Sequence, residues 1–260
     1  MSLVRVLVAK EARELLKTLR VIILPAVFVF FGIAGPGIIR LLPILLKSSE
    51  AQGLDMALPD FGPADGFGQF LELARQMGLL AVLIVYMGIV AGERRDGMLA
   101  TLFVKPVPRS LYLATRWLVN GAYVVVSFLL GAAVALVYTL LLLGRVDVGA
   151  AISATLLYAG YMLLAFSWTT FFSAWMKSPP AAAGLSVLPL FALPALGVLW
   201  EPLGTYGPYG AVAAGTAALG MLGLPAVAIP ASAVISAVLN LGWSVLLVVG
   251  AHAVLRHAEL

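Results

Sequence analysis

The chain contains long runs of apolar residues without a single charged side chain. Residues 117–143 hold no Asp, Glu, Lys or Arg, and residues 150–176 form a second run of the same kind. A helix needs about 20 such residues to cross the apolar core of a bilayer. Charged residues make up only 11% of the chain, whereas soluble domains contain about 25%. The sequence therefore predicts an all-α membrane protein that crosses the bilayer several times.

Six spans fit into the 260 residues with short loops between them. We expect one domain over residues 1–260, folded as a six-transmembrane-helix bundle without a separate soluble part. Pro189 and Pro194 should kink the fifth span, since each removes a helical hydrogen bond. The predicted spans cover about residues 21–39, 70–91, 117–143, 150–176, 181–200 and 234–255.

Residues 1–20 have the pattern of an amphipathic helix. Leu7 and Leu15 fall on one side of the expected helix, while Lys10 and Lys17 fall on the other. Glu11 is an exception, because it interrupts the apolar side. The pattern favours an interfacial helix lying on the membrane surface, and a solvated leader to the first span is the alternative.

Two other segments are less regular. Residues 47–75 are rich in acidic residues, Gly and Pro, which is typical of an external loop. Residues 201–230 are built from Ala and Gly and carry four prolines. We expect this second segment to form an external re-entrant hairpin, with a seventh span as the alternative.

The distribution of basic residues predicts the orientation. Twelve Lys and Arg residues fall on the side of the two termini and the central loop, against four on the other side. Cytoplasmic loops carry the excess of Lys and Arg. Both termini are therefore expected in the cytoplasm, with the protein in the plasma (inner) membrane.

The densest cluster of charge lies between the second and third spans, where four charged residues, Glu93 to Asp96, are consecutive. Apolar residues then recur at i, i+1, i+4 and i+5, a spacing that places them on one face of a helix. Pro106 and Pro108 end this helix, because each lacks an N–H. The pattern predicts a short cytoplasmic helix whose apolar face comprises Met98, Leu99, Leu102 and Phe103.

These residues resemble the cytoplasmic loop of ABC-2 type transporter permeases. In that family a span ends in Gly-Glu, a short coupling helix follows, and a Pro and basic residues open the next span. Met98, Ala100, Pro108 and Arg116 depart from the residue types that are usual in the family. A second likeness, residues 171–185, is similar to the family's tight turn between spans four and five. The matching positions in the loop are Gly92, Glu93, Gly97, Leu99, Leu102, Pro106, Arg109 and Arg116.

The resemblance implies the permease subunit of an ATP-driven transporter, more often an exporter than an importer. Such a subunit forms the substrate path as a dimer with a second copy or a homologous permease, near the second and fifth spans. Cytosolic ABC ATPase subunits would bind ATP and Mg, so no cofactor is expected in this chain. Its other partner would be the lipid bilayer, and no nucleic acid is expected to bind. The residues implied in ATPase coupling are Glu93, Arg94, Arg95, Asp96, Gly97, Leu99, Leu102, Phe103, Pro106 and Arg109. The charged ones, Glu93 to Asp96, would form a polar rim around apolar anchors.

Several chemistries are excluded by what the sequence lacks. The chain contains no GxxxxGK[ST] motif, so it has no P-loop to bind ATP and is not expected to be an enzyme. It has no Cys and two His residues, which leaves no candidate metal site. The expected spans are nearly free of ionisable residues, which favours a partner ATPase over ion coupling. A stand-alone secondary transporter or channel and a non-transport membrane scaffold are the alternatives, and the substrate stays open.

Overall fold

The computed structural model describes residues 3–50, 61–95, 108–222 and 224–257. Its regular secondary structure is entirely helical over these residues. Within the described ranges, six helices are long and apolar enough to cross a membrane, which confirms the prediction of an all-α six-span bundle. The candidate spans are Arg20–Leu45, Pro63–Arg95, Arg109–Leu142, Val148–Trp175, Pro179–Leu199 and Ala231–Arg256.

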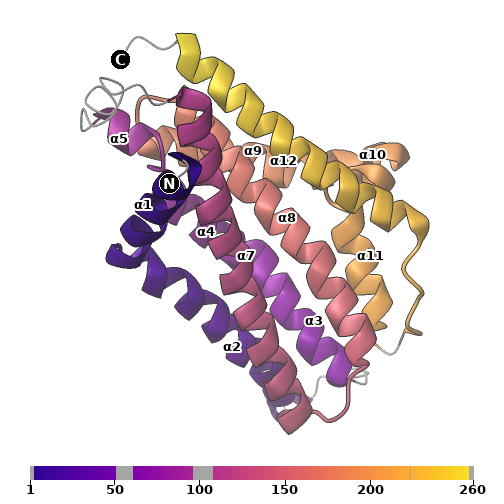
Figure 1. The fold of residues 1–260 in the computed structure, drawn as a ribbon. Helices are drawn as coiled ribbons and strands as arrows, with labels where there is room; N and C mark the ends of the chain where they lie inside the picture. The colour runs from indigo at the N-terminus through magenta and orange to yellow at the C-terminus, as the bar shows by residue number, and fades with distance from the viewer. Residues whose placement is uncertain (1–2, 51–60, 96–107, 223, 258–260) are drawn as a thin grey trace.

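The chain forms the following elements in order (Figure 1). The second span is divided into α3, a π-helical turn η1, α4 and the short α5, with a turn between the last two. The bounds are α1 Leu3–Lys17, α2 Arg20–Glu50, α3 Pro63–Leu73, η1 Ala74–Gly78, α4 Leu79–Tyr86, α5 Ala91–Arg95, α7 Arg109–Leu142, α8 Val148–Trp175, α9 Pro179–Leu199, α10 Glu201–Tyr206, α11 Gly210–Leu219 and α12 Ala231–His257.

The fourth span, α8, is the centre of the bundle. It packs against α7, α9, α11 and α12, and Figure 1 shows it running between α7 and α12. Its most apolar 18-residue stretch is 56% buried, against 17% for the corresponding stretch of α9. The fifth span therefore lies at the edge of the bundle and leaves most of its surface open.

Tyrosine hydroxyls compensate for prolines inside two spans. A proline leaves the carbonyl four residues before it without its helical N–H partner. Tyr123 on α7 donates a hydrogen bond to the carbonyl oxygen of Val21 (2.8 Å), the one freed by Pro25. Tyr161 in the same way donates to Leu190 (3.2 Å), the carbonyl freed by Pro194. Each tyrosine thus supplies the donor that the proline removes.

Glycines bring α2 and α7 together. A Cβ atom on Gly32 would lie 2.5 Å from the carbonyl oxygen of Gly131, and one on Gly131 would lie 2.6 Å from the carbonyl oxygen of Phe28. No other residue type fits at such a distance, so the two backbones pack directly on each other. Small residues commonly allow this approach between membrane helices.

The second span begins earlier than the sequence suggested, at Pro63. Asp65 stabilises this start, since its carboxylate accepts hydrogen bonds from the backbone N–H of Gly62 (2.7 Å) and of Leu222 (2.6 Å). Glu72 and Arg75, which were expected at the outer end of the span where it overlaps the loop, consequently lie well inside the helix. The expectation of spans nearly free of ionisable residues is therefore wrong for this span. Residues 51–60 of the expected loop lie outside the described residues.

Two short helices occupy most of the irregular segment after the fifth span. The helices α10 and α11 have 6 and 10 residues, fewer than the roughly 20 needed for a span. The turn between them is held by α12, because Ser236 donates to the carbonyl of Gly207 (2.7 Å) and Asn240 donates to that of Pro208 (3.0 Å). The placement of this segment on the external side stays a prediction.

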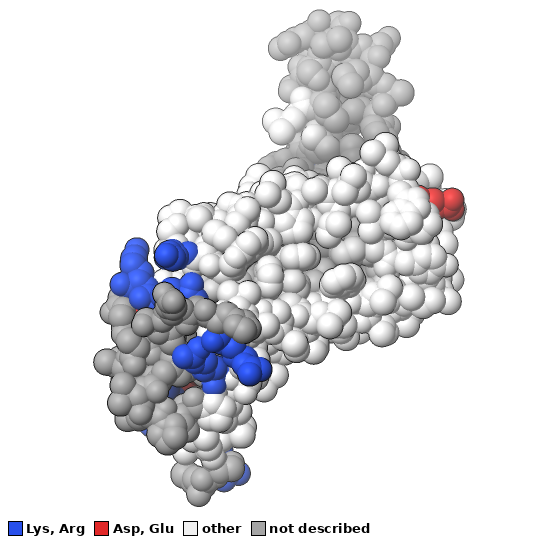
Figure 2. Space-filling model, turned by 90° about the horizontal axis from the view of Figure 1, so that it is seen from above, with Lys and Arg blue, Asp and Glu red and all other residues white. Residues whose placement is uncertain are grey.

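Basic side chains gather at one end of the molecule. In Figure 2 the visible Lys and Arg side chains lie toward the left of the view. The broad middle of this face consists of uncharged residues, drawn in white. Helices α1 and α5, the start of α7 and the end of α12 meet at this end (Figure 1). It is called the basic end below.

Candidate functional site

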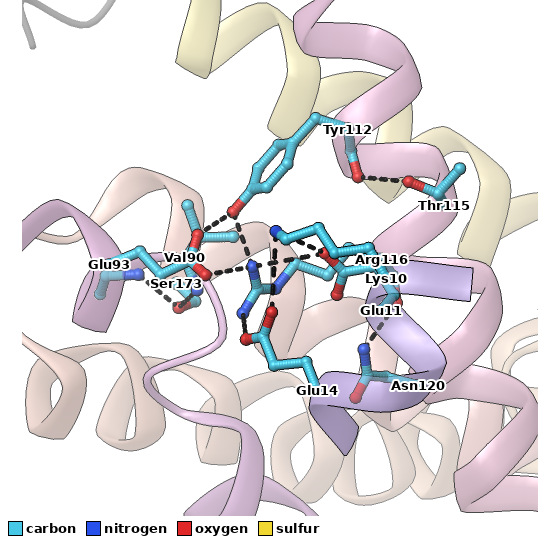
Figure 3. A network of polar contacts seen from close by, with 11 residues as sticks. Lys10, Glu11, Glu14, Val90, Glu93, Tyr112, Thr115, Arg116, Asn120 and Ser173 are labelled. Atoms are coloured by element: carbon cyan, nitrogen blue, oxygen red, sulfur yellow. Dashed lines mark hydrogen bonds and ion pairs between the residues drawn. The ribbon is translucent and has the colours of Figure 1, made fainter. Parts of the chain in front are cut away.

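A network of charged side chains connects three helices at the basic end (Figure 3). Its centre is Arg116 on α7, whose side chain is only 4% exposed. The Nη1 atom of Arg116 lies 2.5 Å from Oε1 of Glu93 on α5. The same nitrogen donates a hydrogen bond to the hydroxyl of Tyr112 (2.9 Å), which in turn donates to the other oxygen of Glu93. Tyr112 and Arg116 are four residues apart and so share one face of α7.

Helix α1 supplies two further carboxylates. Oε1 of Glu14 lies 3.6 Å from Nη2 of Arg116, and Oε1 of Glu11 lies 4.0 Å from Nη1. Lys10 lies 3.6 Å from Glu11 and 3.7 Å from Glu14, so a second cation balances part of the negative charge. We refer to Glu11, Glu14, Glu93, Tyr112 and Arg116 as the Arg116 network.

The network explains the acidic residue on the apolar side of the first helix. Glu11 lies between Leu7 and Leu15, one helical turn away on each side, and all three are buried. Burial raises the pKa of the Glu11 carboxyl above its ordinary value, and the neighbouring Arg116 opposes this shift. An acid at this position is tolerated because it faces a buried guanidinium on α7.

The start of α5 is held by a serine from another span. The first N–H groups of a helix have no partner within that helix. Ser173 on α8 accepts hydrogen bonds from the backbone N–H groups of Val90 and Ala91, each at 3.0 Å. Its hydroxyl also donates to the carbonyl of Met87 (2.8 Å) in the preceding turn. One buried side chain thus fixes the turn and the helix to the central span.

Two of the predicted coupling residues bind helix ends. Nη2 of Arg94 donates to the carbonyl oxygen of Ala174 (2.8 Å) at the end of α8. Nη1 of Arg109 donates to the carbonyl oxygens of Leu255 (2.7 Å) and Arg256 (3.3 Å) near the end of α12. The last carbonyls of a helix lack intrahelical partners and carry partial negative charge, which favours arginine there. The loop's arginines therefore also connect α5 and α7 to two other spans.

A cavity of about 400 Å³ lies beside the network. Arg95 is exposed on its wall, and Arg20 at the start of α2 extends over the ring of Tyr86, 5.4 Å from its centroid. The cavity reaches from α1 to the first residues of α9, Pro179 and Pro180. Charged side chains of α1, α2, α5 and α7 thus line the cavity next to α5.

The structure changes the interpretation of several predicted residues. Glu93 was expected in an open polar rim, but it is 11% exposed and paired with Arg116 inside the protein. Arg94 likewise binds α8, and of the three residues of this group that the structure describes, Arg95 is the one with an exposed side chain. The remaining predicted coupling residues, Asp96, Gly97, Leu99, Leu102, Phe103 and Pro106, lie outside the described residues, as does Met98.

Sequence reasoning missed four residues that complete the site. Glu11 had a signal, since it interrupted an apolar helix face, and Tyr112 precedes Arg116 by one helical turn. Glu14 and Ser173 had none, because an acid on a basic helix and a serine at a span end are common. Arg116 was identified only through the resemblance of the loop.

The fold and the comparisons define the class of the protein. Six helices long and apolar enough to cross a membrane, found among the described residues, define a multi-pass membrane protein. The sequence matches the model of the family described as ABC-2 family transporter protein over residues 5–207. The chain therefore belongs to the ABC-2 transporter family, whose members are membrane transport components.

A curated relative is similar over most of both chains. The uncharacterized transmembrane protein YxlG of Bacillus subtilis (strain 168) is 25% identical over 210 residues, which cover 78% of this chain and 81% of the relative.

Proposed function

We propose that this chain is the permease subunit of an ATP-driven exporter, which works as a dimer and is coupled to separate ATPase subunits. Membership of the ABC-2 family supports pairing with ABC ATPases in general. The absence of a P-loop from the sequence is consistent with ATP hydrolysis on another chain. The protein lies in the plasma (inner) membrane, and its termini and basic end face the cytoplasm. The gathering of Lys and Arg at this end supports that orientation.

The observation that carries the proposal is the attachment of α5. This helix immediately precedes the segment 96–107, which holds the predicted apolar anchors for an ATPase. Glu93 connects it to Arg116 on α7, which also pairs with Glu11 and Glu14 on α1, and Ser173 connects it to α8. When the ATPases close and displace this segment, the movement is therefore passed to three helices at once. Breaking any of these buried contacts instead would cost free energy.

The Glu72–Arg75 pair gives the secondary transporter its best support, since ionisable residues within spans often bind a coupling ion. The two charges of this pair compensate each other within one helical turn. An ion-coupled carrier would transport without an ATPase. The exporter and the secondary transporter therefore differ in whether an ATPase binds to the chain.

Purification with co-purifying proteins tests the proposal. The tagged chain is isolated from its native membrane in mild detergent, and a P-loop ATPase is expected among the bound proteins. Phe103→Ala should lose this ATPase, because truncating an apolar interface anchor commonly costs about 2 kcal/mol or more. Val126→Ala is the matched control, since Val126 is 58% exposed on α7, away from the loop. Retention of the ATPase by both variants, or its absence from the unmutated sample, contradicts the proposal.

A further inference from the structure

The second span carries an ion pair close to the middle of the membrane. Arg75 lies 11 residues before Tyr86 and 12 residues after Pro63, or about 17 and 18 Å along a helix. Tyr86 contacts Arg20, where the first span begins, and so marks the basic end of the apolar layer. Since the apolar core of a bilayer is about 30 Å thick, the pair lies near its centre.

The pair is well formed but not enclosed. Nε and Nη2 of Arg75 donate to the same oxygen of Glu72, at 3.0 and 2.6 Å. The guanidinium lies over the ring of Tyr209, 5.4 Å from its centroid, and the hydroxyl of Tyr158 lies 3.4 Å from the other oxygen of Glu72. The side chains of Glu72 and Arg75 are still 25% and 22% exposed. Gln76, next along the helix, is exposed, with its amide nitrogen 3.5 Å from Glu72.

Such a surface does not suit contact with lipid tails. Charged side chains at the bilayer centre are costly and face a protein interior or water. The Nη1 atom of Arg75 has no hydrogen-bond partner within the described residues, and the amide of Gln76 has unused donors and acceptors. The exposed edge of the pair can therefore both donate and accept further hydrogen bonds.

We propose that Glu72, Arg75 and Gln76 form a water-accessible subsite of the transport path, which binds an uncharged hydrogen-bonding part of the transported molecule, such as hydroxyl or amide groups. The charges of Glu72 and Arg75 cancel each other, so the subsite has no net charge. An anionic ligand would be repelled by Glu72 and a cationic ligand by Arg75 at short range. Hydroxyls and amides can accept from Arg75 and Gln76 and donate to Glu72. The subsite rests on the proposed transport function, but it does not depend on the source of energy.

A single introduced cysteine tests the subsite, because the natural chain has none. Gln76→Cys is reacted in reconstituted vesicles with three methanethiosulfonates of similar size, carrying a neutral hydroxyethyl, an anionic sulfonatoethyl or a cationic trimethylammonioethyl group. Rates are divided by those of a free thiol with the same reagent. Val126→Cys is the control, since it lies exposed near the middle of α7 without a charged neighbour in the same helical turn.

We expect all three reagents to modify Gln76→Cys at least about tenfold faster than Val126→Cys, with the neutral reagent fastest. Adding Glu72→Gln should shift the preference toward the anionic reagent, and adding Arg75→Gln should shift it toward the cationic one, each by about tenfold, which corresponds to 1.4 kcal/mol. The double change Glu72→Gln with Arg75→Gln restores neutrality and should return the preference to the neutral reagent. A return of that preference would also show that these changes leave the protein folded.

Three results would overturn the subsite. Equal rates at the two cysteines would show a lipid-facing position. Spontaneous disulfide formation between two copies through the residue 76 cysteine, without reaction with the reagents, would show a dry contact between copies. A charge preference that is the same with and without Glu72→Gln or Arg75→Gln would show that the pair does not face the water. Reaction as expected without any co-purifying ATPase would preserve the subsite and refute the proposed energy source.

Discussion

The Arg116 network and the Glu72–Arg75 pair are both built on arginine and glutamate, yet they differ in how they are made. The network joins residues up to about a hundred positions apart on three helices, and its arginine is 4% exposed. The pair joins two residues three positions apart on one helix, and both are more than a fifth exposed. The network therefore fixes helices to one another, whereas the pair can change its contacts without moving the bundle.

The largest effect is expected for Arg116→Ala. This change leaves the carboxylates of Glu11, Glu14 and Glu93 near one another without their shared cation. Removing one partner of a buried ion pair costs about 3–5 kcal/mol. Thermal unfolding of the detergent-solubilised protein should show a strongly lowered Tm. Arg40→Ala, at an exposed position of α2, should leave the Tm nearly unchanged. Equal Tm values for both variants would mean that the network does not hold the helices.

Ser173→Ala should have the next largest effect. It removes the acceptor for two backbone N–H groups at the start of α5, and an unsatisfied buried donor costs about 1–3 kcal/mol. Ser153→Ala is the matched control, since Ser153 only donates to a carbonyl of its own exposed helical turn. Hydrogen exchange of residues 87–95 should accelerate in the first variant alone. Unchanged exchange there would show that the serine does not anchor α5.

Glu72→Gln should be milder than either change. If water reaches the pair, the remaining charge of Arg75 stays hydrated, and an exposed ion pair contributes at most about 1 kcal/mol. Thermal unfolding of Glu72→Gln and Glu93→Gln side by side provides the comparison. A loss of several kcal/mol in Glu72→Gln would place the pair in a dry environment and remove its difference from the network.

The smallest effect concerns pH. Because burial raises the pKa of Glu11, the stabilisation by this residue is complete below the ordinary carboxyl pKa and is lost as the pH rises through the raised value. Protease cleavage within α1 should therefore increase from acidic to neutral pH. Glu14, Glu93, Lys10 and Arg116 also surround this group, so Glu11→Gln serves as reference. The change with pH should be smaller in that variant, and an equal change in both would assign it to the neighbours.

The six spans could be predicted because each apolar run is a local property of the sequence. The second span was predicted too short for a physical reason. The predicted start at residue 70 left out residues 63–69, whose Gly residues and Asp65 are typical of a loop. In the structure the Asp65 carboxylate accepts hydrogen bonds from the backbone N–H groups of Gly62 and Leu222, so this acid stabilises the start of the helix.

The candidate site could be predicted only in part. The loop pattern identified Glu93, Arg94, Arg109 and Arg116, but the residues they contact come from distant positions. The contact of Ser173 with Val90 spans 83 residues, and no local pattern encodes such a pairing. Glu11 shows what a local pattern can offer, since a charge that breaks an apolar helix face indicates a buried partner elsewhere.

In the proposed mechanism, the Arg116 network passes the movement of an ATPase to the membrane helices. The most direct measurement is ATP hydrolysis by the purified complex in vesicles, for the unmutated chain and for Glu93→Gln. The variant should keep its ATPase bound, because the apolar anchors are unchanged, but its hydrolysis rate should no longer differ from that of the ATPase alone. Glu14→Gln, whose residue is 40% exposed, should retain most of the difference. Hydrolysis that responds to the membrane subunit equally in all three proteins would contradict the account.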